Sequence, residues 1–216
     1  MSEFSSCLLL DDRSNNECMS PSSTKERILD AAEELMLKRS FHSVGLSQIL
    51  SAVQVPKGSF YHYFASKEEF GVEMLKHYMA DTNAMKRGLL FCREDEPDPL
   101  KRLFGYLETF EANIRKDKGQ FPCLVLKLAS EVTDLSEAMR EELHAGFEEW
   151  IGYYTTILEE AVEANLLPAD TDIPALAQLI QDLWTGAVER SVINHDPAPA
   201  HQARLFIESH LRSLHP

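Results

Sequence analysis

The chain has 216 residues, a formal net charge of −14 and a hydrophobic fraction of 44%, which fits one large globular domain or two modest ones. No apolar run approaches the roughly 18 residues that span a bilayer, and the first ten residues lack the basic start of a secretion signal, so we expect a cytoplasmic protein. The 9 glycines and the many Leu, Ala and Glu residues favour an all-α fold.

Four cysteines, Cys7, Cys18, Cys92 and Cys123, lie far apart, without a CxxC pair or a neighbouring histidine cluster. This spacing argues against a zinc site and against a disulfide framework. The chain also lacks a phosphate-binding glycine loop and a nucleophile with an adjacent base motif. We therefore expect no metal, no cofactor and no enzymatic activity.

The N-terminal segment, residues 1–20, is rich in Ser, Asn and Asp and has no periodicity, so it is predicted to be a disordered arm. A first helix follows, because Ser23 and Glu26 form a capping box and apolar residues then recur at helical spacing until about Ser40. The residues expected on its inner face are Ile28, Ala31, Ala32 and Leu35.

Two short helices are predicted next. The first follows Ser47, and the second begins near Pro56, a residue that suits the first turn of a helix because it has no N–H to leave unpaired. Phe60 and Phe64 lie one turn apart and are expected to pack inward.

Longer helices occupy the rest of the chain. A second capping box at Ser66 to Glu69 opens a helix that runs to about Gly88. The apolar periodicity predicts five more helices, over residues 99–117, 122–131, 135–164, 173–193 and 199–214.

Two short helices joined by a tight turn are typical of a helix-turn-helix DNA reader. With Phe60 and Phe64 turned inward, the residues left to face a duplex are Lys57, Gly58, Ser59, Tyr61, His62 and Tyr63. Ser47 and Lys67 stand at helix N-termini, where backbone N–H groups attract phosphate. The segment 21–80 holds seven Lys/Arg and seven Asp/Glu residues, so the strong acidity lies outside it.

The run from Val55 to Glu69 resembles the recognition helix and following cap of TetR-family transcriptional repressors, and the likeness extends over residues 24–75. The resemblance implies an N-terminal three-helix helix-turn-helix domain (21–70) and a C-terminal helical domain for effector binding and dimerisation (71–216), linked by a helix over about 67–88. It also implies a homodimer that binds a palindromic double-stranded DNA operator through the residues named above and responds to a small molecule. A helical adaptor without DNA binding is the alternative.

The last two helices carry wide apolar faces, which would form a four-helix interface between two copies of the chain. The interface residues expected from them are Leu176, Ile180, Leu183, Val188, Phe206 and Leu211.

Cys123 is the main candidate for sensing. If Pro122 takes the first helical position, Cys123 lies in the first turn, where the helix dipole favours a thiolate, and Lys127 lies on the same face one turn later. Residues 123–140 also resemble the electrophile- and oxidant-sensing repressors of the family, and more loosely the acrylate-responsive ones. The electrophile sensors carry a lysine where this chain has Val192, which leaves Lys127 as the candidate amine.

Three alternatives remain for Cys123: a reactive sensor, a small packed side chain, or a non-covalent contact in a ligand pocket. Without sensor chemistry at Cys123, the effector is a non-covalent small organic ligand such as a short unsaturated acid. Aromatic residues are further candidates for the ligand site, although helical spacing also suits a plain core: Phe104, Phe110, Trp150, Tyr154 and Trp184.

Overall fold

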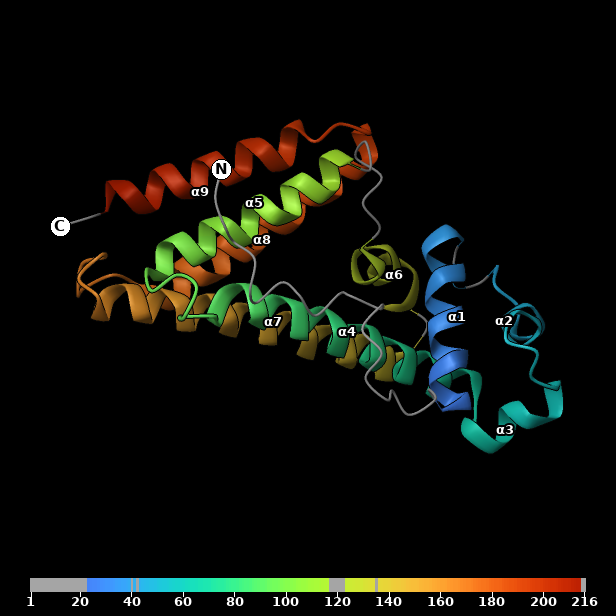
Figure 1. Cartoon of the computed structure of the whole chain (residues 1–216). Coiled ribbons are helices and arrows are strands. Elements are labelled where there is room, and N and C mark those ends of the chain that lie inside the picture. Colours follow the sequence, from blue (N-terminus) through green and yellow to red (C-terminus); the bar gives the residue numbers. More distant parts are fainter. Residues whose placement is uncertain (1–22, 40, 42, 117–122, 135, 215–216) are drawn as a thin grey trace. The chain divides into compact units, whose positions relative to one another are not determined.

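The computed structural model describes residues 23–39, 41, 43–116, 123–134 and 136–214, and within these residues every regular element is a helix (Figure 1). The all-α fold expected from the sequence is confirmed, and the helices predicted after residue 98 agree closely with the observed ones. The predicted arm over residues 1–20, with Cys7 and Cys18, lies outside the described residues. None of the helices described is long and apolar enough to cross a membrane. The helices are α1 (Thr24–Lys38), α2 (Leu46–Ala52), α3 (Phe60–Tyr63), α4 (Lys67–Phe91), α5 (Pro99–Lys116), α6 (Leu124–Val132), α7 (Glu137–Glu163), α8 (Ile173–Asn194) and α9 (Ala198–Ser213), with a 3-10 turn over Lys57–Ser59 before α3.

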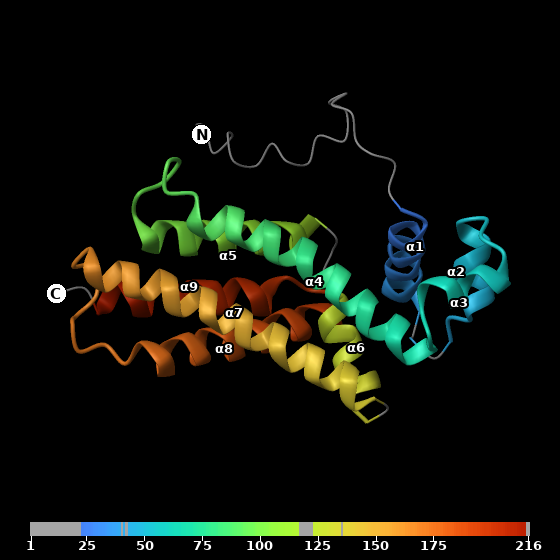
Figure 2. The ribbon, with the colours of Figure 1, turned by 90° about the horizontal axis from the view of Figure 1, so that it is seen from below.

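The described residues form two compact units. The small unit comprises residues 23–82 and 123–146, and the large unit comprises residues 83–116 and 147–214. Helices α4 and α7 contribute residues to both units, and Figure 2 shows the two long helices from below. The segment of the chain around Cys123 therefore belongs to the same unit as α1, α2 and α3.

Helix α1 begins as the sequence predicted. The Ser23 side chain accepts a hydrogen bond from Glu26 N at 3.2 Å, and Ser23 N donates to the Glu26 carboxylate at 2.7 Å. The buried face differs from the expected one, because Ala31 and Leu35 are only partly buried. The helix is rotated so that a stripe shifted by about one position meets the core: Ile28, Leu29, Ala32 and Met36.

Within the small unit, α4 and α7 approach closely at two glycines. A Cβ at Gly71 would lie 2.7 Å from the Met139 sulfur, and one at Gly146 would lie 1.7 Å from the Met79 methyl group. At each glycine, a methionine side chain of the facing helix occupies the space that a side chain would need. Alanine at Gly146 would require Met79 to move.

In the large unit, α9 packs against α8 and α5, and the three helices run beside one another in Figure 1. The α8 helix ends at His195, whose left-handed backbone (φ 51°) turns the chain toward α9. The Ser191 hydroxyl in α8 accepts a hydrogen bond from Ala200 N at 3.1 Å. Glu111 of α5 accepts from Arg204 Nε at 2.5 Å, which ties α5 to α9.

Candidate DNA-binding and effector sites

The reading segment consists of the 3-10 turn and α3. Phe60 and Phe64 are each 1% exposed, and their ring centroids lie 5.1 Å apart. Phe70 of α4 lies within 5.5 Å of both rings by centroid distance, so the three phenylalanines hold the segment against the unit. The inward packing predicted for Phe60 and Phe64 is confirmed.

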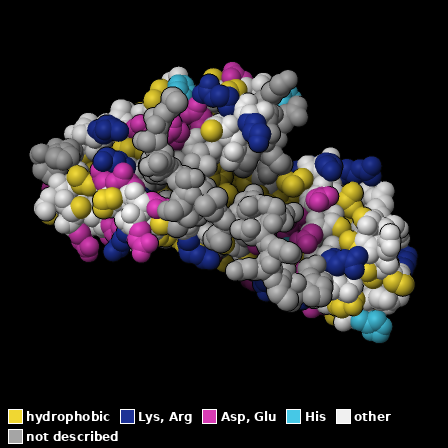
Figure 3. Space-filling model, viewed as in Figure 1, with side chains coloured by type: hydrophobic (Ala, Val, Ile, Leu, Met, Phe, Trp, Pro, Cys, Tyr) yellow, Lys and Arg dark blue, Asp and Glu magenta, His cyan; other side chains and the backbone are white. Residues whose placement is uncertain are grey.

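The other side of this segment faces outward. Tyr61 is 64% exposed and Tyr63 is 36% exposed, which is unusual for aromatic side chains in a small helical unit. Lys57, Gly58 and His62 are also exposed, and Ser59 is partly buried. Basic and hydrogen-bonding groups are therefore displayed together on a short rigid segment. In Figure 3, Lys and Arg side chains lie among apolar and some Asp and Glu side chains on the visible part of this unit.

The sequence suggested that Pro56 lies in the first turn of a helix, and this prediction is wrong. Pro56 is the N-cap residue that precedes the 3-10 turn, its backbone is extended (φ −60°, ψ 140°), and α3 begins only at Phe60. The residue before the turn must be extended for the chain to enter it, and proline has the required φ. The consequence is that Lys57 and Gly58 lie in the turn that leads into the short helix.

Ser47 and Lys67 are each found at a helix start. Ser47 is the second residue of α2 and is exposed, while Lys67 is the first residue of α4 and is exposed. The Lys67 ammonium lies 5.1 Å from the centroid of the Phe41 ring, a cation–π contact that steadies its side chain. Both positions leave a hydrogen-bond donor beside the N–H groups of a first helical turn.

Cys123 is the N-cap residue of α6, one position before the first turn in which the sequence placed it. Its side chain is partly buried, and it interacts with the hydroxyl of Tyr78. That hydroxyl also accepts a hydrogen bond from Leu124 N at 3.2 Å. Burial and the adjacent Cys123 raise the pKa of Tyr78 well above its usual range, so the phenol stays protonated.

Helix α6 is connected to the end of α1 by two further polar side chains. The Lys127 ammonium donates to the Leu37 carbonyl at 2.7 Å, and the Glu131 carboxylate accepts from Phe41 N at 2.8 Å. Cys123, Lys127 and Glu131 are spaced four residues apart and share one face of α6. One side of α6 therefore bonds to α4 at its start, to α1 through Lys127, and to the segment just after α1 through Glu131.

The aromatic candidates for the effector site belong to the large unit and are almost fully enclosed. Phe104 and Phe110 are each 8% exposed, Trp150 5%, Tyr154 1% and Trp184 4%. Trp150 Nε1 donates to the Asn83 side chain at 2.7 Å, and Lys86 Nζ donates to the Tyr106 hydroxyl at 2.8 Å. Cys123 and Lys127 belong to the small unit instead. The residues that the sequence predicts for the effector site are therefore found in two different units.

Sequence reasoning did not identify Tyr78, Glu131, Asn83 or Lys86. A signal existed for the last two, since Asn83 and Lys86 fall on the buried stripe of α4 between two apolar residues, Met79 and Leu90. Polar side chains at inward positions of an amphipathic helix are uncommon and often functional. Tyr78 and Glu131 carry no such signal, because the partners described above for them, Cys123 and Leu124 N for Tyr78 and Phe41 N for Glu131, lie far away in the sequence.

The residues expected at a dimer interface lie on α8 and α9. Leu176, Ile180, Val188 and Leu211 are at most 8% exposed within the single chain, since α8 and α9 already pack against each other. Phe206 is 55% exposed and Leu183 is partly buried. Leu179 and Leu205, on the apolar faces that the sequence predicts for these helices, are 53% and 41% exposed; Ile193, which sequence reasoning did not name, is 69% exposed.

Two short helices, α2 and α3, thus display basic and aromatic side chains outward while Phe60, Phe64 and Phe70 pack inward. This arrangement is that of a helix-turn-helix DNA-binding regulator. Residues 28–74 match the family of bacterial regulatory proteins, tetR family, and residues 99–207 match the tetracyclin repressor-like C-terminal domain. The chain belongs to the TetR family of transcriptional regulators.

Known relatives cover nearly the whole chain. It is 34% identical to the HTH-type transcriptional repressor NemR of Escherichia coli (strain K12), over 86% of this chain and 92% of that protein. It is 30% identical to the HTH-type transcriptional repressor DhaR of Mycobacterium sp. (strain GP1), over 85% and 90%. The crystal structure of reduced E. coli NemR superposes with a TM-score of 0.74, covering 89% of this chain and 97% of that one. These relatives are regulators, which confirms that the chain is a regulator and not an enzyme.

Proposed function

We propose that the chain is a homodimeric repressor that reads a palindromic operator with Lys57 to Tyr63. The observation that carries this proposal is that Tyr61, His62 and Tyr63 are exposed while the phenylalanines behind them are buried. Lys57 and the tyrosines donate to base edges and phosphates, while Gly58 permits close approach of the backbone. Ser47 and Lys67 bind phosphates on either side of the reading segment.

The dimer is proposed to form through α8 and α9. Leu179, Leu205 and Phe206 expose apolar surface on these helices, and a shallow groove beside them is lined by Leu183 and His210. A second copy of the chain would cover this surface across a two-fold axis. Two reading segments would then meet successive major grooves about 34–36 Å apart, which accounts for a palindromic operator.

An effector is proposed to release the operator by changing the populations of two dimer conformations that differ in the spacing of their reading segments. For a reactive electrophile, the site is Cys123. Its thiolate forms a carbon–sulfur bond as the electrophile's carbon–carbon double bond opens, and water protonates the resulting carbanion. The adduct would lie at the contact between Cys123 and Tyr78, at the start of α6, which is bonded to α1 by Lys127 and to Phe41, just after α1, by Glu131.

This route is tested by replacing Cys123 with Ser and measuring operator release by N-ethylmaleimide in a fluorescence anisotropy assay. Cys92→Ser is the matched control, because Cys92 is also partly buried but directly follows the last residue of α4 and belongs to the large unit. We expect C123S to keep operator binding and to lose release, and C92S to behave as the wild type. Full release of C123S would exclude the covalent route.

A non-covalent ligand is the second candidate effector. It is favoured by the buried polar contacts of the large unit, in which Lys86, Tyr106 and Asn83 lie among the aromatic candidates. Most ligand sites combine apolar walls with a few converging polar groups. Operator release by unreactive small molecules, unchanged in C123S, would support this candidate over the covalent one.

A further inference from the structure

The first turn of α4 is held by hydrogen bonds of two kinds. Within the turn itself, the Ser66 side chain accepts from Glu69 N at 3.0 Å, and the Glu69 carboxylate accepts from Ala65 N at 2.5 Å. These local bonds decide where the helix begins. They do not decide how its first turn is oriented against the other helices of the small unit, so that orientation depends on contacts from outside α4.

One such contact comes from the start of α7. Ser136 directly precedes α7 and is 9% exposed, and its hydroxyl donates to the Glu68 carboxylate at 2.6 Å. The same hydroxyl accepts from Met139 N at 3.2 Å, and its single proton goes to Glu68. A hydrogen bond to a carboxylate is stronger than one between neutral groups, and this one joins residues that are 68 positions apart. Glu68 is thereby held toward α7.

A second contact reaches the adjacent face of the same turn. Lys67 and Gly71 are four residues apart and share that face. The Phe41 ring lies against it, since the Lys67 ammonium is 5.1 Å from the ring centroid and a Cβ at Gly71 would lie 3.2 Å from the ring. Phe41 is 7% exposed, and its backbone N–H donates to the Glu131 carboxylate of α6 at 2.8 Å. Glu131 therefore holds the residue against which Lys67 packs.

Together the two contacts restrict the direction of the Lys67 side chain. Successive residues of a helix are about 100° apart around its axis, so a turn that is held at Glu68 toward α7 places Lys67 on the neighbouring side, against Phe41. Lys67 is exposed, and a free lysine side chain loses much conformational entropy when its ammonium binds one phosphate. Fixing the helix turn and the ring before DNA arrives reduces that cost.

We propose that Ser136 and Glu131 are positioning residues for DNA binding. They hold the first turn of α4 and the Phe41 ring so that the Lys67 ammonium meets an operator phosphate. Both residues act through Lys67 and not by contacting DNA themselves. This inference rests on the proposed function, in which Lys67 binds a phosphate beside the reading segment.

The test is fluorescence anisotropy of the full-length protein on a DNA fragment selected with the wild type, measured over a range of salt concentrations. Lys67→Met is expected to weaken binding and to lower the magnitude of the salt slope by about 2, because a dimer loses two phosphate contacts. Ser136→Ala is expected to weaken binding about threefold to tenfold, the range of one hydrogen bond. Circular dichroism checks that each variant is folded.

The double variant S136A/K67M separates positioning from a general loss of stability. If Ser136 acts through Lys67, its replacement has no further effect once the ammonium is gone, and S136A/K67M binds as K67M does. A merely structural role predicts that S136A weakens K67M as much as it weakens the wild type. Ser213→Ala, at the exposed end of α9, is the matched control for loss of a serine hydroxyl, and we expect wild-type binding.

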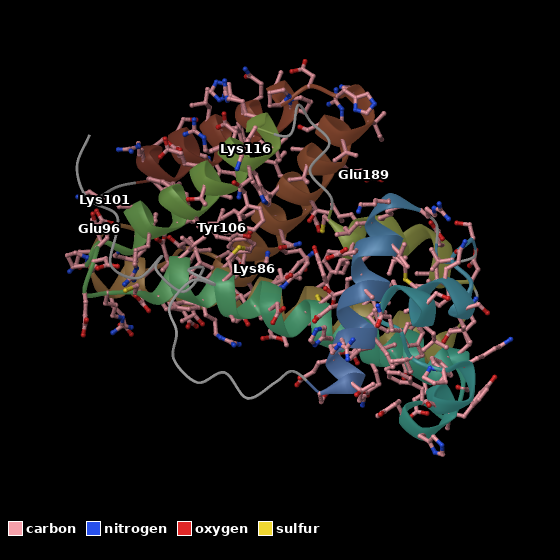
Figure 4. The ribbon with its side chains drawn as sticks, turned by 45° about the vertical axis from the view of Figure 1, so that its right-hand side comes forward. Lys86, Glu96, Lys101, Tyr106, Lys116 and Glu189 are labelled. Atoms are coloured by element: carbon pink, nitrogen blue, oxygen red, sulfur yellow. The ribbon has the colours of Figure 1, made fainter. Side chains whose placement is uncertain are left out.

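Two replacements of Glu131 test the contact with Phe41. Glu131→Gln keeps a side-chain oxygen that accepts from Phe41 N and should bind as the wild type does, whereas Glu131→Ala should weaken binding about threefold to tenfold. This pair decides the question if S136A does not fold. Lys101→Met is the control for loss of a positive charge, because Lys101 lies beside Glu96 near the start of α5, in the large unit (Figure 4). We expect K101M to keep the wild-type affinity and salt slope.

The positioning role is overturned if S136A and E131A bind as the wild type does while K67M is weakened. It is also overturned if E131Q is as weak as E131A, or if S136A weakens K67M and the wild type equally. A K67M variant with wild-type affinity and salt slope would instead refute the phosphate contact proposed for Lys67, and the positioning role with it. The same titrations thus distinguish failure of the inference from failure of the proposed function.

Discussion

The Tyr78 hydroxyl of α4 accepts a hydrogen bond from the backbone N–H of Leu124, the first residue of α6, at 3.2 Å. Cys123 directly precedes Leu124 and interacts with the same hydroxyl. A chemical change at the thiol thus occurs where α6 starts and where α4 contacts it. The same helix α6 bonds to Leu37 of α1 through Lys127 and to Phe41, just after α1, through Glu131, so the α6 helix itself joins the contacts at Cys123 to α1.

Removing this hydroxyl should weaken the small unit. Tyr78→Phe leaves the Leu124 N–H without its acceptor, and we expect the free energy of unfolding to fall by about 1–2 kcal/mol. Tyr153→Phe is the control, since the bonds of the Tyr153 hydroxyl among the described residues go to exposed side chains, Arg87 and Glu149. Urea denaturation of both variants measures the difference. Equal stability of Y78F and the wild type would mean that the Tyr78 bond contributes nothing.

Lys127 is expected to transmit the change at Cys123 rather than to react. Lys127→Met removes the hydrogen bond to the Leu37 carbonyl, so N-ethylmaleimide should still alkylate Cys123 while operator release falls several-fold. Mass spectrometry measures alkylation, and anisotropy measures release on the same sample. Lys116→Met, at the exposed end of α5, serves as control. Loss of alkylation in K127M would instead assign Lys127 to activation of the thiol.

The Glu33 carboxyl should make stability depend on pH. Burial raises its pKa to about 7, opposed by His77 and reinforced by Asp81 and Asp30. Since the folded pKa lies above the unfolded value of 4.5, the associated stability is complete below pH 4.5 and is lost as the pH rises through 7.

Replacing this carboxyl with the neutral amide should remove the penalty of ionising it. We expect Glu33→Gln to be more stable than the wild type by about 1–2 kcal/mol at pH 8 and equal to it at about pH 4. The exposed neighbour Glu34→Gln should show no such pH dependence. Calorimetric melting at both pH values gives the comparison, and a constant difference between E33Q and the wild type would rule out titration of Glu33.

The Glu111 carboxylate should act in the opposite sense. Burial disfavours its charge, but hydrogen bonds from Arg204, Arg115 and His201 outweigh burial and lower its pKa to about 2. Its stabilisation is therefore present above pH 4.5 and is lost as the pH falls toward 2. At pH 7, Glu111→Gln should destabilise the large unit by about 3 kcal/mol, and the exposed Glu108→Gln by less than about 0.5 kcal/mol. Similar denaturation midpoints for these two variants would contradict this role.

Local signals in the sequence predicted much of the fold. The Ser23 capping box, the Phe60–Phe64 spacing and the periodicity of α5 to α9 each depend on neighbours within one or two turns, and the structure agrees with them. The 3-10 turn after Pro56 was missed because its conformation depends on how Phe60 is held by Phe70 of α4.

The candidate sites were predicted less completely. The outward position of Tyr61, His62 and Tyr63 could be predicted, because Phe60 and Phe64 are spaced one turn apart and turn inward, which is a local pattern. The contacts of Cys123 with Tyr78 and of Lys86 with Tyr106 join segments that are 45 and 20 residues apart, and no periodicity within one helix indicates such pairs.

Operator binding by the reading segment is the central claim, and salt-dependent anisotropy tests it most directly. DNA fragments that bind the wild type are first selected from a random pool and sequenced. With about four phosphate contacts in each half-site, the logarithm of affinity should fall with the logarithm of salt concentration with a slope of roughly −7 on a palindromic sequence. Lys57→Ala and Tyr61→Ala should each weaken binding at least about tenfold. Failure to select any palindrome, or K57A and Y61A binding that equals the wild type, would contradict it.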